Sequence, residues 1–255
     1  MRFFAILFLM VFSLFADVSS RVMDVPTRTN VSERLLVLTP KTPKAVVVLF
    51  AGGHGGLQLS NEGKFGWGEG NFLMRTRELF TQAGLMVVIV DAPSDRQREP
   101  YLNGFRQTKE HVQDISSVVA WIQTQTTAPI WLVGTSRGTQ SVAYIATENS
   151  NGIHGIVLTS SILYDAKSDA VSEMKLEKLT MPVLVIHHQN DGCSHCSFDL
   201  IPSLMNKLSA SSAKELIAIE GGQTKGDPCN AFGHHGFNGV EQEVVTQIVN
   251  WVIAH

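Results

Sequence analysis

The sequence predicts one α/β domain, with a mostly parallel, doubly wound sheet covered by helices on both faces. Apolar β-rich runs recur along the chain, and most are too continuous for strands buried on one face only. Helix-length segments alternate with these runs, a pattern that favours right-handed crossovers between parallel strands. The 255 residues are 44% hydrophobic and no repeat or linker divides them, so a single large core is expected.

Apolar runs predict the strands in chain order. They cover residues 34–38, 45–51, 85–92, 130–134, 155–159, 183–188 and 215–220. Intervening segments predict helices at residues 72–83, 109–125, 139–148, 202–209 and 240–254. The last segment places apolar residues on one face, as a helix docked on a sheet requires. The first two strands are joined by a connection too short for a crossover, so we expect an antiparallel hairpin at the sheet edge.

Residues 1–20 predict a cleavable export signal. A positive charge at Arg2 precedes an uncharged apolar run, and small residues end the segment. The run is shorter than the ~20 residues that cross a bilayer, so we expect cleavage after Ala16 or Ser20 and no stable membrane insertion. The mature domain would then cover residues 21–255 of a periplasmic or secreted protein.

The charge balance argues against a nucleic-acid partner. The formal net charge is −3, and the charged stretches are short and mixed in sign, so no basic surface is expected. A small-molecule partner is the better expectation.

The stretch GTSRG, residues 134–138, follows an apolar strand and precedes a helix. This is the G-x-S-x-G pattern of a nucleophile elbow, in which the glycines relieve crowding around a serine held at a sharp strand-to-helix turn. Ser136 is therefore the candidate nucleophile. An ordinary helix N-cap is the alternative role for this serine.

A serine hydroxyl becomes a nucleophile when a histidine accepts its proton and an acid orients that histidine. Asp191 follows the expected strand 183–188, and the pair His234 and His235 lies between the last strand and the last helix. The carboxyl ends of parallel strands meet at one edge of the sheet, so the three groups are expected there together.

These residues give the chain a resemblance to the α/β-hydrolase superfamily, over nearly all of its length after the export signal. The HHGF stretch near the last helix resembles the small dienelactone-hydrolase-like members. The resemblance implies Ser136 as nucleophile, Asp191 as acid and His235 as base. Two alternatives stay open, namely His234 as the base and Asp165, one strand earlier, as the acid.

The glycine-rich stretch AGGHGG lies at the end of the expected strand 45–51, where the superfamily has its oxyanion loop. The resemblance implies backbone N–H donors at Gly53 and at Arg137, the latter at a helix N-terminus whose dipole favours negative charge. The order of residues departs from the usual HGGG, so Gly52 and His54 remain alternatives to Gly53.

The chain contains three cysteines, Cys193, Cys196 and Cys229, and export to an oxidising compartment favours a disulfide between two of them. We expect Cys193 to pair with Cys229, because Asp191 lies two residues before the first and His235 six residues after the second. The bond would tie the acid loop to the histidine loop. Cys196 is the alternative to Cys193.

Two functions of other classes compete with hydrolysis. The first is a zinc-binding protein, with ligands from the cluster around residues 187–196: His187, His188, Cys193, His195 and Cys196, with Cys229 as a further candidate. The paired second half of a structural zinc site is missing, which argues against this interpretation. The second is a binding protein without catalysis on the same fold. The hydrolase itself needs neither a metal nor an organic cofactor.

The short segment between the strands at 155–159 and 183–188 leaves no room for a large lid domain. The site should be open or covered by the loops at residues 54–72 and 92–107. Those loops hold candidate pocket residues for a small acyl group or an anionic substrate: Trp67, Phe72, Arg96, Arg98 and Tyr101. The sequence therefore predicts an exported serine esterase or related hydrolase that cleaves a small ester, thioester or other acyl substrate through an acyl-enzyme.

Overall fold

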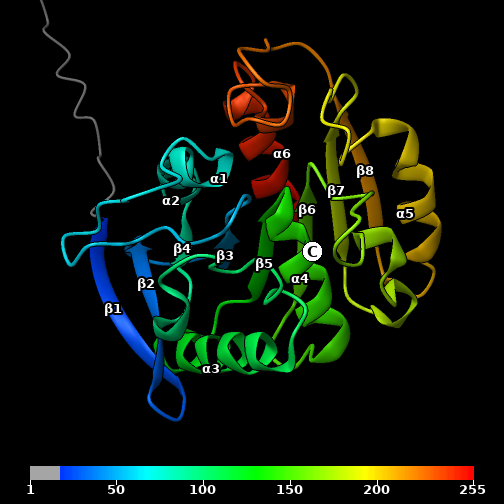
Figure 1. The fold of residues 1–255 in the computed structure, drawn as a ribbon. Coiled ribbons are helices and arrows are strands. Elements are labelled where there is room, and N and C mark those ends of the chain that lie inside the picture. The colour runs from blue at the N-terminus through cyan, green and yellow to red at the C-terminus, as the bar shows by residue number, and fades with distance from the viewer. Residues whose placement is uncertain (1–17) are drawn as a thin grey trace, which may run out of the picture.

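An open sheet of eight strands forms the centre of the computed structural model, which describes residues 18–255. The strands are β1 (Ser19–Arg28), β2 (Val31–Thr39), β3 (Ala45–Phe50), β4 (Leu85–Val90), β5 (Ile130–Thr135), β6 (Gly155–Thr159), β7 (Val183–His188) and β8 (Lys214–Ile219). They lie side by side in the order β1-β2-β4-β3-β5-β6-β7-β8 (Figure 1). The strands β1, β2 and β4 pair antiparallel, and all pairs from β4 onward in that order are parallel.

Helices cover both faces of the sheet. They are α1 (Phe72–Arg75), α2 (Arg77–Gln82), α3 (Lys109–Gln125), α4 (Arg137–Glu148), α5 (Ile201–Lys207) and α6 (Glu241–Ala254). Short 3₁₀ turns lie at Ser94–Arg96, Val171–Glu173, Leu176–Lys178, Phe198–Leu200 and His234–Gly236. Apolar residues of α3, α4 and α5 pack on one face, and those of α1, α2 and α6 on the other. The expected fold class is confirmed.

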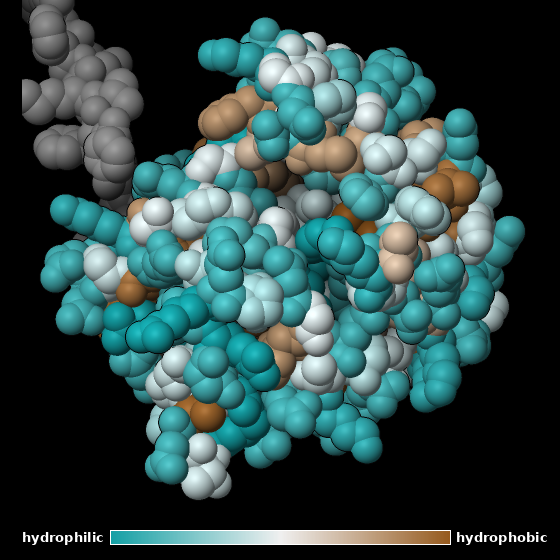
Figure 2. All heavy atoms as spheres, viewed as in Figure 1, coloured by the Kyte–Doolittle hydropathy of each residue, from teal (hydrophilic) through white to brown (hydrophobic). Residues whose placement is uncertain are grey.

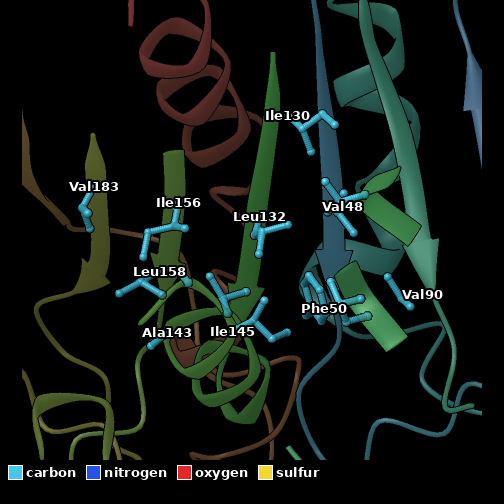
Figure 3. Packing of buried hydrophobic residues seen from close by; sticks show 14 of the residues in the cluster. Val48, Phe50, Val90, Ile130, Leu132, Ala143, Ile145, Ile156, Leu158 and Val183 are labelled. Atoms are coloured by element: carbon cyan, nitrogen blue, oxygen red, sulfur yellow. The ribbon is translucent and has the colours of Figure 1, made fainter. Parts of the chain in front are cut away.

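Successive side chains of β3 point to opposite faces of the sheet, so this one strand contributes to two apolar cores. Val48 and Phe50 belong to the cluster covered by α3 and α4, whereas Val47 and Leu49 belong to the cluster covered by α6. Figure 3 shows side chains of the first cluster, from β3, β5, β6 and α4, gathered between helix and sheet. Burial of each such aliphatic side chain contributes about 1.5–3 kcal/mol, so the sheet is held in place from both sides.

The expected hairpin between the first two predicted strands is wrong. β2 pairs with β1 and β4, and β3 pairs with β4 and β5, so β4 separates β2 from β3. The connection from Pro40 to Lys44 is too short for a crossover that includes a helix. It can still pass one intervening strand, because β2 and β3 are then two interstrand spacings apart, about 10 Å. An edge hairpin does exist, and β1 and β2 form it. β1 is missing from the expected strands because its side chains mix polar and apolar types without a buried run.

The other expected bounds hold to within a few residues, and α3, β6 and β7 have the bounds expected. The predicted helix at residues 72–83 is an exception, since α1 and α2 meet at a break. The hydroxyl of Thr76 donates to the Phe72 carbonyl at 2.7 Å. The backbone of Thr76 departs from helical geometry at this point, with φ −101° and ψ 2°.

The carboxyl edge of the sheet has no lid domain in the part of the chain that the structure describes. Between β6 and β7 the chain forms only loops and two 3₁₀ turns. Hydrophilic residues predominate on the face drawn in Figure 2, and the apolar residues there form small separate groups. No inserted domain therefore covers the strand ends among the described residues, as expected, and long loops at residues 51–71 and 91–108 follow β3 and β4.

The expected export signal, residues 1–20, lies almost wholly outside the described residues. Between residues 18 and 255, no helix has the length and apolar character needed to span a bilayer.

Candidate active site

A sharp turn between β5 and α4 holds Ser136. Its backbone has φ 53° and ψ −128°, a conformation that a non-glycine residue adopts only where its surroundings enforce it. A Cβ on Gly138 would lie 2.1 Å from the Phe50 carbonyl oxygen, and one on Gly134 would lie 2.6 Å from the Gly138 carbonyl oxygen. Both positions therefore need glycine, as in a nucleophile elbow. The Ser136 side chain makes no capping hydrogen bond with α4, so the N-cap alternative does not apply.

The glycine turn after β3 lies against Ser136. A Cβ on Gly52 would lie 2.9 Å from the Ser136 Cβ, and one on Gly53, where φ is +58°, would lie 2.5 Å from the Trp67 ring. On the other side, Arg137 begins α4, so its N–H is among the first helical N–H groups, which have no acceptor within a helix. The expected oxyanion donors, Gly53 and Arg137, thus belong to the two turns that adjoin the serine.

Asp191 and His235 meet at the carboxyl edge of the sheet, one from the loop after β7 and the other from the 3₁₀ turn before α6. His235 Nδ1 lies 2.9 Å from Asp191 Oδ2, and both residues are buried. An ionised carboxylate only accepts hydrogen bonds, so the Nδ1 proton of His235 donates to it. The other carboxylate oxygen accepts the N–H of Cys193 at 2.9 Å. This tautomer leaves Nε2 of His235 free to accept a proton.

Hydrogen bonds and close packing fix the histidine loop. Ser160 Oγ donates to the His235 carbonyl at 2.7 Å, and Arg75 Nη2 donates to the Gly236 carbonyl at 2.6 Å. A Cβ on Gly236 would lie 1.9 Å from the Ala231 carbonyl oxygen. The glycine of the HHGF stretch is therefore required by packing against the preceding loop.

The two alternative partners lie elsewhere. The His234 ring stacks on His188 with centroids 4.2 Å apart, and its Nδ1 lies 3.1 Å from the Asn190 carbonyl oxygen. Asp165 pairs with Arg137 at 2.6 Å. Burial tends to raise the pKa of Asp165, but hydrogen bonds from surrounding backbone and side-chain groups, Arg137 included, lower it to about 2. The structure therefore brings together Asp191 and His235 and neither alternative.

Ser136 and His235 line the same cavity, which has a volume of about 260 Å³. The rest of its wall consists of neutral residues: Gly52, Gly53, Trp67, Gly68, Gly70, Asn71, Phe72, Thr135, Cys229, Asn230, Ala231 and Gly236. No lysine, arginine, aspartate or glutamate is among these lining residues.

Some of the expected pocket residues line this cavity and others do not. Trp67 and Phe72 line the cavity, as expected. Arg96 and Tyr101 do not, because Arg96 lies over the Phe105 ring at 4.7 Å and Tyr101 stacks on His54 at 4.3 Å. Arg98 is also absent from the wall, so the expectation of arginines around the substrate is wrong at this cavity.

Cys193 and Cys229 form a disulfide that links the loop of Asp191 to the loop that precedes His235. The bond encloses a sequence separation of 36 residues. A loop of this size lowers the entropy of the unfolded chain enough to stabilise the fold by ~4 kcal/mol in the chain-entropy treatment. The bond therefore limits how far Asp191 can move from His235.

The six residues considered as zinc ligands do not converge. A metal site needs several ligand atoms close together. Among the described residues, one group of three histidine, cysteine or acidic side chains has ligand atoms within 4.8 Å of one another, namely Cys193, Cys196 and His235. The Cys193 sulfur is in the disulfide and has no thiolate to offer a metal. The other histidines bind carbonyl oxygens: His187 that of Cys196, His188 that of Gly221 and His195 that of Tyr164.

Three residues of the site have no counterpart among the expected ones. Asn71 lines the cavity and caps α1 by accepting the N–H of Leu73 at 3.2 Å, a role that an asparagine before a helix could have indicated. Asn230 lines the cavity from an irregular loop that carries no pattern. Arg106 donates to the carbonyl of Gly53 from a segment without a known motif.

No protein-family model and no curated relative matches the sequence. Solved structures do match over most of the chain. A cold-adapted esterase from an Arctic intertidal metagenomic library has 17% identity and a TM-score of 0.63, covering 91% of this chain and 94% of its own. A dienelactone hydrolase from Anabaena variabilis has 13% identity and a TM-score of 0.65, covering 93% and 98%. An esterase of Pyrococcus furiosus has 13% identity and a TM-score of 0.64, covering 92% and 91%.

We expect Cys196 to be the free thiol of the oxidised protein and to be unreactive while the protein is folded. Its side chain is fully buried, and burial raises the pKa of the thiol, so little thiolate is present. Iodoacetamide should modify no cysteine in the folded protein and only Cys196 after unfolding without reductant, as peptide mapping would show. Modification of Cys193 or Cys229 under those conditions would contradict the observed pairing.

Proposed function

We propose that this protein, whose fold is that of the α/β hydrolases, is a serine hydrolase that cleaves a small uncharged ester or related acyl substrate through an acyl-enzyme. The observation that carries the proposal is the hydrogen bond from His235 to Asp191 beside a cavity that His235 shares with the strained Ser136. The structural similarity to esterases and to a dienelactone hydrolase supports it.

The proposed reaction begins when Ser136 Oγ attacks the substrate carbonyl carbon. Nε2 of His235 accepts the hydroxyl proton, because Nδ1 already carries the proton that binds Asp191. The carboxylate stabilises the imidazolium that forms, and the imidazolium then donates the proton to the leaving group. A water molecule then attacks the carbonyl of the acyl-enzyme while His235 accepts its proton. The imidazolium returns this proton to Ser136 Oγ as the acid product leaves, which regenerates the serine.

The developing oxyanion needs donors that are already in place. We assign this role to the backbone N–H groups of Gly53 and Arg137, from the turns on either side of Ser136. Each such donor contributes about 10²–10³-fold to kcat in enzymes of this kind. The N-terminal end of α4 adds the favourable dipole of a helix.

The cavity favours a small substrate without charge. Its lining residues are neutral, and its volume of about 260 Å³ suits a short acyl or alcohol group. Two exposed aromatic side chains, Trp67 on the wall and Phe232 beside Gly70, offer apolar surface at its margin. A charged group would lose hydration there without gaining a partner.

Export is part of the proposal. The Cys193–Cys229 disulfide suits an oxidising compartment, and the N-terminal segment has the composition of a signal. Cleavage after Ala16 would leave β1 complete, whereas cleavage after Ser20 would remove its first two residues. A periplasmic or secreted enzyme is the resulting assignment.

A fluorophosphonate probe should label the wild-type protein at Ser136. Ser136→Ala removes the nucleophile and should abolish both labelling and ester hydrolysis, a loss of about 10⁶-fold in kcat, while thermal unfolding remains near that of wild type. Mass spectrometry of the labelled peptide checks the site. Absence of labelling in the wild type would favour a binding protein on this fold.

The two histidines should differ sharply in kinetic effect. His235→Ala should lower kcat by about 10⁴-fold or more, because no other group can accept the serine proton. His234→Ala is the matched control and should retain most of the activity, since its ring stacks on His188 instead. Asp191→Asn should cost about 10⁴-fold by favouring the wrong imidazole tautomer. A larger loss from His234→Ala than from His235→Ala would overturn the assignment.

Substrate preference should follow the size and neutrality of the cavity. Among p-nitrophenyl esters, kcat/KM should be highest for acetate or butyrate and should fall for decanoate and palmitate. The hemisuccinate ester, which adds a carboxylate at nearly constant length, should be at least about 10-fold worse than the valerate because the charge must be desolvated. Equal rates for the charged and neutral pair would show that this cavity does not bind the acyl group.

A further inference from the structure

Arg106 carries a buried guanidinium without an acidic partner. It lies in the loop between β4 and α3 and is 5% exposed. Arg28, Arg75 and Arg137 each pair with an aspartate or glutamate, whereas no carboxylate pairs with Arg106 among the residues that the structure describes. Its Nε also has no hydrogen-bond partner. The protein therefore tolerates the cost of burying this charge.

The two terminal nitrogens of Arg106 bind the elements that form the proposed oxyanion site. Nη2 donates to the carbonyl of Ala51 at 3.1 Å and to that of Gly53 at 3.2 Å. Nη1 donates to Ser141 Oγ on α4 at 2.9 Å. A Cβ on Gly55 would lie 2.5 Å from Nη2, so a glycine at this position makes room for the guanidinium.

A second buried side chain, His111, contacts the serine that accepts a hydrogen bond from Arg106. His111 Nε2 lies 3.0 Å from Ser141 Oγ. Burial, together with the charge of Arg106, lowers the pKa of His111 to about 3, so this imidazole is neutral. Because Arg106 can only donate to Ser141 Oγ, the serine hydroxyl can donate to His111 in turn. Hydrogen bonds thus hold both terminal nitrogens of Arg106.

The positions of the bound carbonyls determine the direction of the peptide groups in the glycine turn. The carbonyl of Ala51 shares a peptide unit with the N–H of Gly52, and the carbonyl of Gly53 shares one with the N–H of His54. Both units are trans, so these N–H groups point away from the guanidinium. The Gly53 N–H, the proposed oxyanion donor, lies between the two fixed units.

A neutral donor would satisfy two carbonyl oxygens at a lower cost of burial than a guanidinium. What a cation adds is an electric field. The positive charge stabilises peptide dipoles whose oxygens point toward it, and it also favours negative charge on the far side of the turn. Burial, with a smaller contribution from the charge of Arg137, lowers the pKa of Arg106 to about 9, so the group stays charged at neutral pH.

We propose that Arg106 is a positioning residue for the oxyanion site, which clamps the Gly52–Gly53 turn through two carbonyls and supplies a buried positive charge behind it. The inference rests on the proposed function, since it assumes that an oxyanion forms at Ser136. It assigns a role in turnover to a side chain that does not line the cavity.

The test compares Arg106→Met with the wild type on p-nitrophenyl acetate. Loss of the clamp and the charge should lower kcat by ~10²-fold, with KM changed little, because the effect is confined to the transition state. The rate constant for fluorophosphonate labelling should fall in parallel. Thermal stability should be unchanged or raised, since an apolar side chain replaces an unpaired buried charge. Arg34→Met, which removes a half-buried arginine paired with Asp24, is the control and should leave kcat unchanged.

Two further variants separate charge from hydrogen bonding. Arg106→Gln keeps an N–H donor but no charge, and it should be nearly as slow as Arg106→Met. Arg106→Lys keeps the charge and should recover about 10-fold of the lost kcat. If Arg106→Met fails to fold, the glutamine and lysine variants give the same comparison between a neutral and a charged side chain.

Each outcome decides a different question. A wild-type protein that neither hydrolyses esters nor reacts with the fluorophosphonate would refute the proposed function. A wild type that does both, together with an Arg106→Met variant of unchanged kcat, would refute only the role of Arg106. A loss of thermal stability without a loss of kcat would make Arg106 a structural residue and would equally overturn the inference.

Discussion

The close approach of α4 to the end of β3 is the constraint on which the site depends. At Gly138 no side chain separates the helix from the Phe50 carbonyl, where a Cβ would lie 2.1 Å away. Because the helix begins so near the sheet, the chain between them must turn sharply, and Ser136 takes the strained conformation at that turn. The same approach brings the first N–H groups of α4 beside the glycine turn after β3, so the proposed nucleophile and the proposed oxyanion donors both depend on one packing contact.

The ionisable groups around this turn come from three distant parts of the sequence. The carboxylate of Asp191 follows β7, the imidazole of His235 precedes α6, and the guanidinium of Arg106 precedes α3. His235 lines the cavity, whereas Asp191 and Arg106 are buried and are not among its lining residues. Such an arrangement excludes water from the ionic groups and keeps their orientation fixed before the substrate arrives. The disulfide adds a covalent limit to the same arrangement, because it joins the loop of Asp191 to the loop before His235.

Much of the fold follows from the sequence because it depends on local pattern. The continuous apolar runs predict strands buried on both faces, and the bounds of α3, β6 and β7 agree with those expected. The break at Thr76 and the position of β1 do not follow, since neither proline nor glycine marks the first and pairing with β2 decides the second. The insertion of β4 between β2 and β3 is likewise a matter of strand pairing over a long distance in the chain.

For the site, the sequence by itself indicated the two glycines that flank Ser136, because their spacing is a local pattern. The contact that requires Gly134 is local, with the Gly138 carbonyl, whereas the contact that requires Gly138 is with Phe50 on β3. The order of Ser136, Asp191 and His235 along the chain also suggested the proposed triad. Only the tertiary structure placed His235 and not His234 against Asp191, excluded Asp165 through its pairing with Arg137, and kept Arg96 and Arg98 away from the cavity. It alone placed Arg106 behind the glycine turn. The physical reason is that each of these outcomes is a contact between segments far apart in the chain, whose direction depends on the packing of the whole sheet and not on neighbouring residues.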